Sequence, residues 1–168
     1  MSNDWSTITT PQERKQTAGK ILPSTMVPWE AYDSCLACTS YCNLTNASRF
    51  LRDPNVTLRH LQMIGGCFIS VMSSGCSPEF ELSRVFEAGA KKYSRDSWRQ
   101  GVNTNLLLQA SWRHLNKYLD GETINHDDGE CTHLGHALWQ VVAAIWMINN
   151  NPEYVDTPGL RKGIDEEL

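Results

Sequence analysis

The sequence lacks an excess of basic residues, because 15 Lys and Arg stand against 19 Asp and Glu, giving a net charge of −4. A general nucleic-acid-binding surface needs basic side chains that neutralise phosphates, so we expect no nucleic-acid partner beyond one nucleotide in a local pocket. The amino terminus has no basic stretch followed by an apolar run, and we expect no signal peptide. The apolar run from 137 to 148 is broken by Gln140 and is shorter than the ~20 residues that cross a bilayer, so no membrane partner is expected.

Six cysteines and sequons at Asn43, Asn46 and Asn55 would suit a secreted protein. Without a leader, we instead expect a cytoplasmic chain whose thiols are reduced or metal-bound, with the sequons present by chance. A length of 168 residues with 40% hydrophobic content indicates one packed domain.

A predicted helix over about 132–149 organises the chain. No Pro or Gly interrupts the sequence from His136 to Asn151. On a helical wheel, Glu130, His133, His136 and Gln140 share one sector, and apolar residues fill most of the rest. Such a helix is expected to be buried by its neighbours, so its polar residues form the wall of a site. Alternatively, each histidine donates to a carbonyl in an ordinary core.

We therefore predict a mainly α fold, a compact helical domain around this central helix. The expected parts are a flexible N-terminal arm (1–28), a cysteine-rich segment (29–76), a helical catalytic core (77–151) and a C-terminal tail (152–168). Residues 58–72 are apolar but contain Gly65-Gly66, and the pattern leaves helix and strand open.

Local signals mark the ends of two further helices. Ser77-Pro78-Glu79 is typical of a helix start, with Ser77 as the N-cap. Thr104 or Asn105 is expected to cap the next helix, and Asp120-Gly121 to end it.

The cysteine-rich segment contains Cys35-x2-Cys38-x3-Cys42, a partial zinc pattern. A closed zinc site needs four ligands, and the fourth could come from His60, Cys67 or Cys76. The alternative is three buried or idle thiols on one face of a short helix.

Two polar segments flank the predicted helices. The loop from Asp120 to Glu130 is rich in carboxylates, which either bridge a hard cation such as Mg²⁺ or are simply solvated. The connection 94–101 interleaves Arg95 and Arg99 with Trp98, a combination that can hold phosphates and stack on a base. Trp98 could equally pack against the core.

Five short motifs occur in order between residues 79 and 150. They are Gly89-Ala90-Lys91-Lys92-Tyr93, Ser97-Trp98-Arg99-Gln100-Gly101, Arg113-His114, Asp127-Asp128-Gly129-Glu130 and His133-Leu134-Gly135-His136-Ala137-Leu138-Trp139. This ordered set resembles the phage-associated dATP/dGTP diphosphohydrolase family, which is grouped with MazG-like nucleotide pyrophosphohydrolases.

The resemblance implies a MazG-like helical bundle that hydrolyses purine deoxynucleoside triphosphates to monophosphate and pyrophosphate, adjusting the nucleotide pool of a phage-infected cell. It implies Mg²⁺ or Mn²⁺ as cofactor and, by analogy, a homo-oligomer. The expected metal ligands are Asp127, Asp128, Glu130 and His133. The expected catalytic residues are His133, His114, His136 and Glu130. The expected substrate-binding residues are Lys92, Arg95, Trp98, Arg99 and Arg113.

Two other hypotheses for the function stay open. An HD-type metal phosphohydrolase would use His114 and the pair His126-Asp127. A non-enzymatic phage interaction module would be stabilised by zinc on the cysteines, with its histidines in the core.

Overall fold

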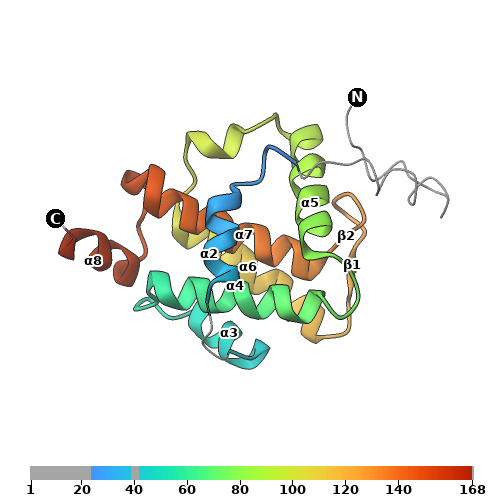
Figure 1. Ribbon diagram of the computed structural model, residues 1–168, viewed down its shortest axis with the longest axis horizontal. Helices are drawn as coiled ribbons and strands as arrows, with labels where there is room; N and C mark the ends of the chain where they lie inside the picture. Colours follow the sequence, from blue (N-terminus) through green and yellow to red (C-terminus); the bar gives the residue numbers. More distant parts are fainter. Residues whose placement is uncertain (1–23, 39–41, 168) are drawn as a thin grey trace.

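The computed structural model describes residues 24–38 and 42–167 (Figure 1), so most of the arm predicted for residues 1–28 lies outside the described residues. Within them the chain forms seven α-helices, two short 3-10 helices and one two-stranded hairpin, which confirms the mainly α prediction. In chain order the elements are α2 (Trp29–Leu36), α3 (Leu44–Leu51), α4 (Leu58–Met72), α5 (Pro78–Lys92), η2 (Ser97–Gln100), α6 (Thr104–Leu119), β1 (Ile124–Asn125), β2 (Cys131–Thr132), α7 (His133–Asn150), η3 (Pro152–Tyr154) and α8 (Pro158–Glu166).

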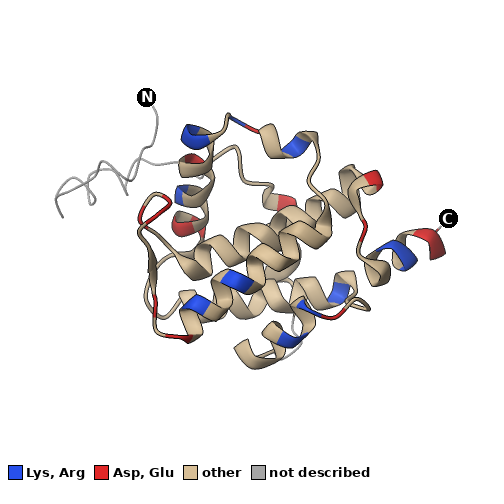
Figure 2. Ribbon diagram, turned by 180° about the vertical axis from the view of Figure 1, so that it is seen from behind, with Lys and Arg blue, Asp and Glu red and all other residues tan. Residues whose placement is uncertain are grey.

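Helix α7 is the centre of the fold, as the sequence predicted. It packs against α6, α4, α5 and α2 and is enclosed by them (Figure 1). Its ribbon carries no Lys, Arg, Asp or Glu, whereas acidic residues lie along the loop between α6 and α7 (Figure 2). This helix has 18 residues and is apolar on most sides, so several neighbouring helices are needed to bury it.

Short-range signals set several helix ends. Ser77 is the N-cap of α5, where its hydroxyl accepts the backbone N–H of Phe80, and Pro78 is the first helical residue. Residues 58–72, left open from sequence, form α4, which begins at a capping box between Thr57 and His60. None of the helices in the described parts of the chain has both the length and the hydropathy that a membrane crossing needs.

The start of α6 differs from the prediction. Neither Thr104 nor Asn105 is the N-cap, which is Asn103 and makes no side-chain capping bond. A carboxylate from beyond α7 caps the helix instead, since Asp156 Oδ1 accepts the backbone N–H of Asn105 at 2.9 Å and the hydroxyl of Thr104 at 3.2 Å. Thr157 completes this network with a hydroxyl contact of 2.8 Å to Thr104.

Asp156→Ala should lower the free energy of unfolding by about 1 kcal/mol, because it removes the cap and a negative charge at the N-terminus of α6. Urea unfolding followed by circular dichroism measures the change. Glu153→Ala, which removes an exposed carboxylate three residues away, is the matched control and should change stability by less than about 0.5 kcal/mol. Equal stability of Asp156→Ala and wild type would contradict the capping role.

Both ends of the described chain pack on the core. Residues 152–167, expected as a tail, form η3 and α8 and bury Val155, Thr157 and Leu160. Residues 24–28, expected within the arm, bury Ser24, Met26 and Val27 beside α5 and η2.

Candidate active site

A pocket of about 190 Å³ lies where α5, α6, α7 and the η2 connection meet. One side is aromatic, with Phe86, Trp98 and Trp139. The other side is polar, with His114 from α6, His136 and Gln140 from α7, and Asp128 from the loop that precedes it. The predicted polar sector of α7 therefore reaches a pocket through His136 and Gln140.

The aromatic wall belongs both to the core and to the pocket. Trp98 packs against Phe86, Trp139 and Trp146, with ring centroids 5.7, 6.0 and 5.1 Å away. Its indole Nε1 is buried and has no hydrogen-bond partner among the described residues, and the same holds for Nε2 of His136. Unpaired buried polar atoms are costly, so these two, on residues that line one pocket, mark positions where a ligand could pair with the protein.

Three imidazoles form a cluster at the polar side. Nδ1 of His114 lies 3.0 Å from Nδ1 of His133. The ring of His114 also stacks on that of His136, with centroids 4.7 Å apart and planes 15° apart. His133 and His136 are only 1% and 3% exposed, and their spacing of three residues puts both on one face of α7.

Glu122, which was not among the predicted site residues, completes this cluster. Its Oε2 lies 3.0 Å from Nε2 of His133. The β1–β2 hairpin brings it there, because Ile124 pairs with Thr132 and the backbone N–H of His133 donates to the carbonyl of Thr123. Strands of two residues are too short to show a periodic pattern in the sequence, so the carboxylate-rich loop was the only sequence feature that pointed to Glu122.

Glu81 is a second carboxylate that the sequence did not reveal. It is 4% exposed, on α5. One oxygen accepts the backbone N–H of Thr132, the N-cap of α7, at 2.7 Å, and the other pairs with Arg84 at 3.2 Å. Arg84 in turn donates to the carbonyl of Glu130. This pair ties the start of α7 and the hairpin to α5.

Burial and neighbouring imidazoles lower the pKa of His114 and His136. Burial first, then His136 and His133, lowers the pKa of His114 to about 3. Burial also lowers the pKa of His136, against the opposing charge of Asp128. At neutral pH both rings are therefore uncharged and each keeps one lone pair.

The lowered pKa of His114 predicts that the protein loses stability in mild acid. Between the ordinary pKa of 6.5 and about pH 3, His114 is protonated in the unfolded chain but neutral in the folded chain. The free energy of unfolding therefore falls as the pH is lowered through this range. The limit for one such group is about 1.4 kcal/mol per pH unit, reduced here because the ring is partly exposed. Urea titrations at pH 7, 6 and 5 should show a shallower loss for His114→Gln than for wild type, and parallel curves would contradict the assignment.

The predicted metal ligands are not gathered around one point. Asp128 lines the pocket, and Asp127 is exposed. Glu130 is exposed and its carboxylate contacts His126 at 2.7 Å, while both ring nitrogens of His133 are engaged. Among the residues that the structure describes, no three His, Cys, Asp or Glu side chains are grouped to hold an ion. The metal-ligand set stays a prediction, as does the HD-type reading, for which His126 lies exposed beside Glu130.

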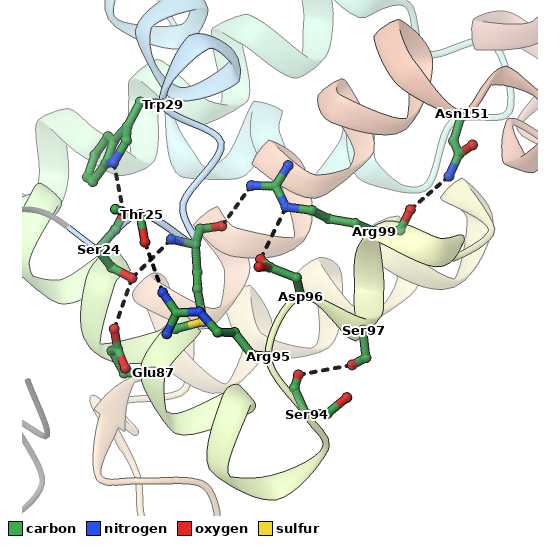
Figure 3. A network of polar contacts seen from close by, with 11 residues as sticks. Ser24, Thr25, Trp29, Glu87, Ser94, Arg95, Asp96, Ser97, Arg99 and Asn151 are labelled. Carbon is green, nitrogen blue, oxygen red and sulfur yellow. Dashed lines mark hydrogen bonds and ion pairs between the residues drawn. The ribbon is translucent and has the colours of Figure 1, made fainter. Parts of the chain in front are cut away.

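The predicted phosphate-binding cations lie outside the pocket lining. Arg95 donates to the Thr25 hydroxyl at 2.9 Å, and Arg99 donates to the carbonyl of Met26 at 3.1 Å and pairs with Asp96 at 3.2 Å (Figure 3). These contacts hold residues 24–28 against η2. Lys92 and Arg113 are exposed on α5 and α6.

The cysteines, all within the described residues, are free thiols. Cys35 is buried in α2, whereas Cys38 and Cys42 follow it outside the helix. Cys42 lies close enough to Cys67 to interact with it, and burial raises the pKa of Cys67 to about 12. His60 stacks on Phe50 and caps α4. A structural zinc on Cys35, Cys38 and Cys42 stays a prediction.

Fold and pocket together define an all-α domain whose candidate active site combines imidazoles, a carboxylate and aromatic rings. Residues 76–157 match the model of the family described as "dATP/dGTP diphosphohydrolase, N-terminal". The match confirms the resemblance predicted for residues 79–150. Searches of curated proteins and of solved structures returned no match.

Proposed function

We propose that the protein hydrolyses purine deoxynucleoside triphosphates between the α and β phosphates, releasing the monophosphate and pyrophosphate. The observation that carries this proposal is the position of the pocket. Apart from Met26, the residues that line it fall within the segment that matches the diphosphohydrolase family. The reaction would adjust deoxynucleotide levels, in keeping with the phage role implied by the resemblance.

The size and chemistry of the pocket suit one part of the nucleotide. Sites for whole drug-sized ligands measure about 300–1,000 Å³, so about 190 Å³ suits the base better than the entire substrate. Phe86, Trp98 and Trp139 offer aromatic surface for a purine. The unpaired Nε1–H of Trp98 would donate to a ring nitrogen or carbonyl, and the amide of Gln140 would supply further selectivity.

The triphosphate would extend past Asp128 toward the rim. No Lys or Arg is among the residues lining the pocket, but Lys92 and Arg95 flank the lining residues Tyr93 and Ser94 in the sequence. A triphosphate anion could replace the Thr25 hydroxyl as the partner of Arg95, because a charge-assisted bond to phosphate is stronger than one to a neutral hydroxyl.

The divalent cation is best treated as part of the substrate, because the described side chains do not form a ready three-ligand set. Asp128 lines the pocket together with His114 and His136, and Asp127 and Glu130 lie in the same loop. Carboxylate oxygens are the ligands that Mg²⁺ and Mn²⁺ accept when they arrive bound to phosphates. Water would lose its proton to an imidazole of the cluster, because a neutral ring keeps a lone pair that can accept it.

A substrate screen tests the proposal. The purified full chain is incubated with each of the four dNTPs and with Mg²⁺ or Mn²⁺, and products are separated by ion-exchange chromatography. We expect dAMP or dGMP plus pyrophosphate from the purine substrates. Absence of turnover with every dNTP and both cations would overturn the proposal, and release of inorganic phosphate or triphosphate would replace it with a different phosphohydrolase.

A further inference from the structure

A continuous line of side chains leads from the surface to the pocket. Glu122 is 61% exposed and contacts the buried His133, which contacts His114, a residue of the pocket wall. Both links measure 3.0 Å, within hydrogen-bonding distance. A core histidine ordinarily finds a backbone carbonyl. Here His133 instead contacts a carboxylate with one ring nitrogen and a second imidazole with the other, and this pair of contacts needs a functional explanation.

With Glu122 ionised and the His133 ring neutral, the two links assign each hydrogen to one atom. An ionised carboxylate only accepts, so Nε2 of His133 carries the hydrogen that binds Glu122. In a neutral ring Nδ1 of His133 is then an acceptor. Its partner, Nδ1 of His114, must donate. Nε2 of His114 consequently keeps its lone pair and is the ring nitrogen left for the pocket.

We propose that Glu122 and His133 are positioning residues that set the tautomer of His114, so that Nε2 of His114 accepts the proton of the attacking water. This inference rests on the proposed function. In the step, the O–H bond of water breaks as its proton moves to Nε2. The water oxygen bonds to one of the two phosphorus atoms that share the α–β bridging oxygen, and the bond from that phosphorus to the bridge breaks. Pyrophosphate leaves with the electron pair if the α phosphorus is attacked, and the nucleoside monophosphate leaves with it if the β phosphorus is attacked. The imidazolium of His114 then releases its proton to solvent.

The line of contacts also explains how the exposed carboxylate of Glu122 can act on His114, which it does not touch. When His114 gains a proton, its Nδ1–H still donates to His133, and Nε2–H of His133 still donates to Glu122. The carboxylate stabilises the positive charge through an intervening ring without itself becoming protonated. The carboxylate of a serine-protease triad stabilises its imidazolium by direct contact, also without becoming protonated.

Ring tautomers can be observed directly, without any substrate. Long-range ¹H–¹⁵N spectra of protein labelled with ¹⁵N-histidine distinguish Nδ1–H from Nε2–H rings, with His114→Gln and His133→Gln used for assignment. We expect His133 as the Nε2–H form and His114 as the Nδ1–H form. In Glu122→Gln, whose amide can donate as well as accept, an Nε2–H population of His114 should appear. Wild-type His114 in the Nε2–H form, or an unchanged spectrum in Glu122→Gln, would overturn the proposal.

Kinetics separate positioning from binding. Glu122→Gln should lower kcat at least about 10-fold with KM within about 2-fold, and Glu122→Asp should restore part of the rate. Asp120→Asn, which neutralises another exposed carboxylate of the same loop, is the matched control and should retain wild-type kcat. If wild type is inactive on every dNTP, the proposed function fails. If wild type is active and Glu122→Gln matches it, the positioning role alone fails.

Discussion

His114→Gln is expected to lower the kcat for hydrolysis of dATP or dGTP by about 10²–10⁴-fold, the range that a positioned general base contributes. His114 lines the pocket, and its Nδ1 is committed to His133. A glutamine amide can keep the donation to His133, so the cluster stays paired, but it cannot take a proton at neutral pH. Initial rates of pyrophosphate release at saturating substrate measure the effect.

Gln109→Ala is the matched control for this experiment, because Gln109 is exposed on the same helix α6 and lies outside the pocket lining. It should retain wild-type kcat, and both variants should show the circular dichroism spectrum of wild type. A His114→Gln enzyme with more than half the wild-type rate would remove His114 from the chemistry, and would leave His136 as the imidazole to test next.

Gly65→Ala is expected to lower the free energy of unfolding by about 1–3 kcal/mol, although alanine is the better helix former, because overpacking a filled core costs this much. A Cβ at residue 65 would lie 2.3 Å from Sγ and 3.0 Å from Cβ of Cys35. Cys35 is 0% exposed in α2, so its side chain has no open space to enter. Urea unfolding of the variant measures the loss.

Gly163→Ala supplies the opposite case. Gly163 lies within α8, and a Cβ there would meet nothing within 4 Å. Helix propensity alone should then raise stability by up to about 1 kcal/mol. If Gly65→Ala is as stable as wild type or more so, α2 and α4 do not pack as tightly as described.

The sequence was sufficient to predict the central helix and the starts of several others. The observed α7 covers His133–Asn150, against a predicted 132–149, because a long apolar stretch without Pro or Gly has few alternatives. Ser77 and Pro78 mark the start of α5 through contacts within four residues. For α4, the pair Gly65-Gly66 obscured the helical signal. The tertiary structure supplies the reason for these glycines, which is the close approach of α2 at Cys35.

The site was predicted less completely. Grouping His133 and His136 on one face of a helix is a local property, and residues 113–114 belonged to the motifs of the family resemblance. Which groups meet these histidines was not visible, since Glu122 reaches His133 through a hairpin of two-residue strands. Charge alone also did not reveal that Arg95 and Arg99 hold residues 24–28, because a guanidinium can donate to a phosphate, to a hydroxyl or to a backbone carbonyl.

The sequence by itself determined that one apolar helix with a polar sector would be buried and that helices would surround it, because hydrophobic periodicity and capping residues act over a few positions. Only the tertiary structure decided which carboxylates reach the imidazoles, which arginines are engaged elsewhere and which aromatic rings close the pocket. Those pairings join residues from separate elements, and their energies depend on distance and burial, which sequence order does not encode.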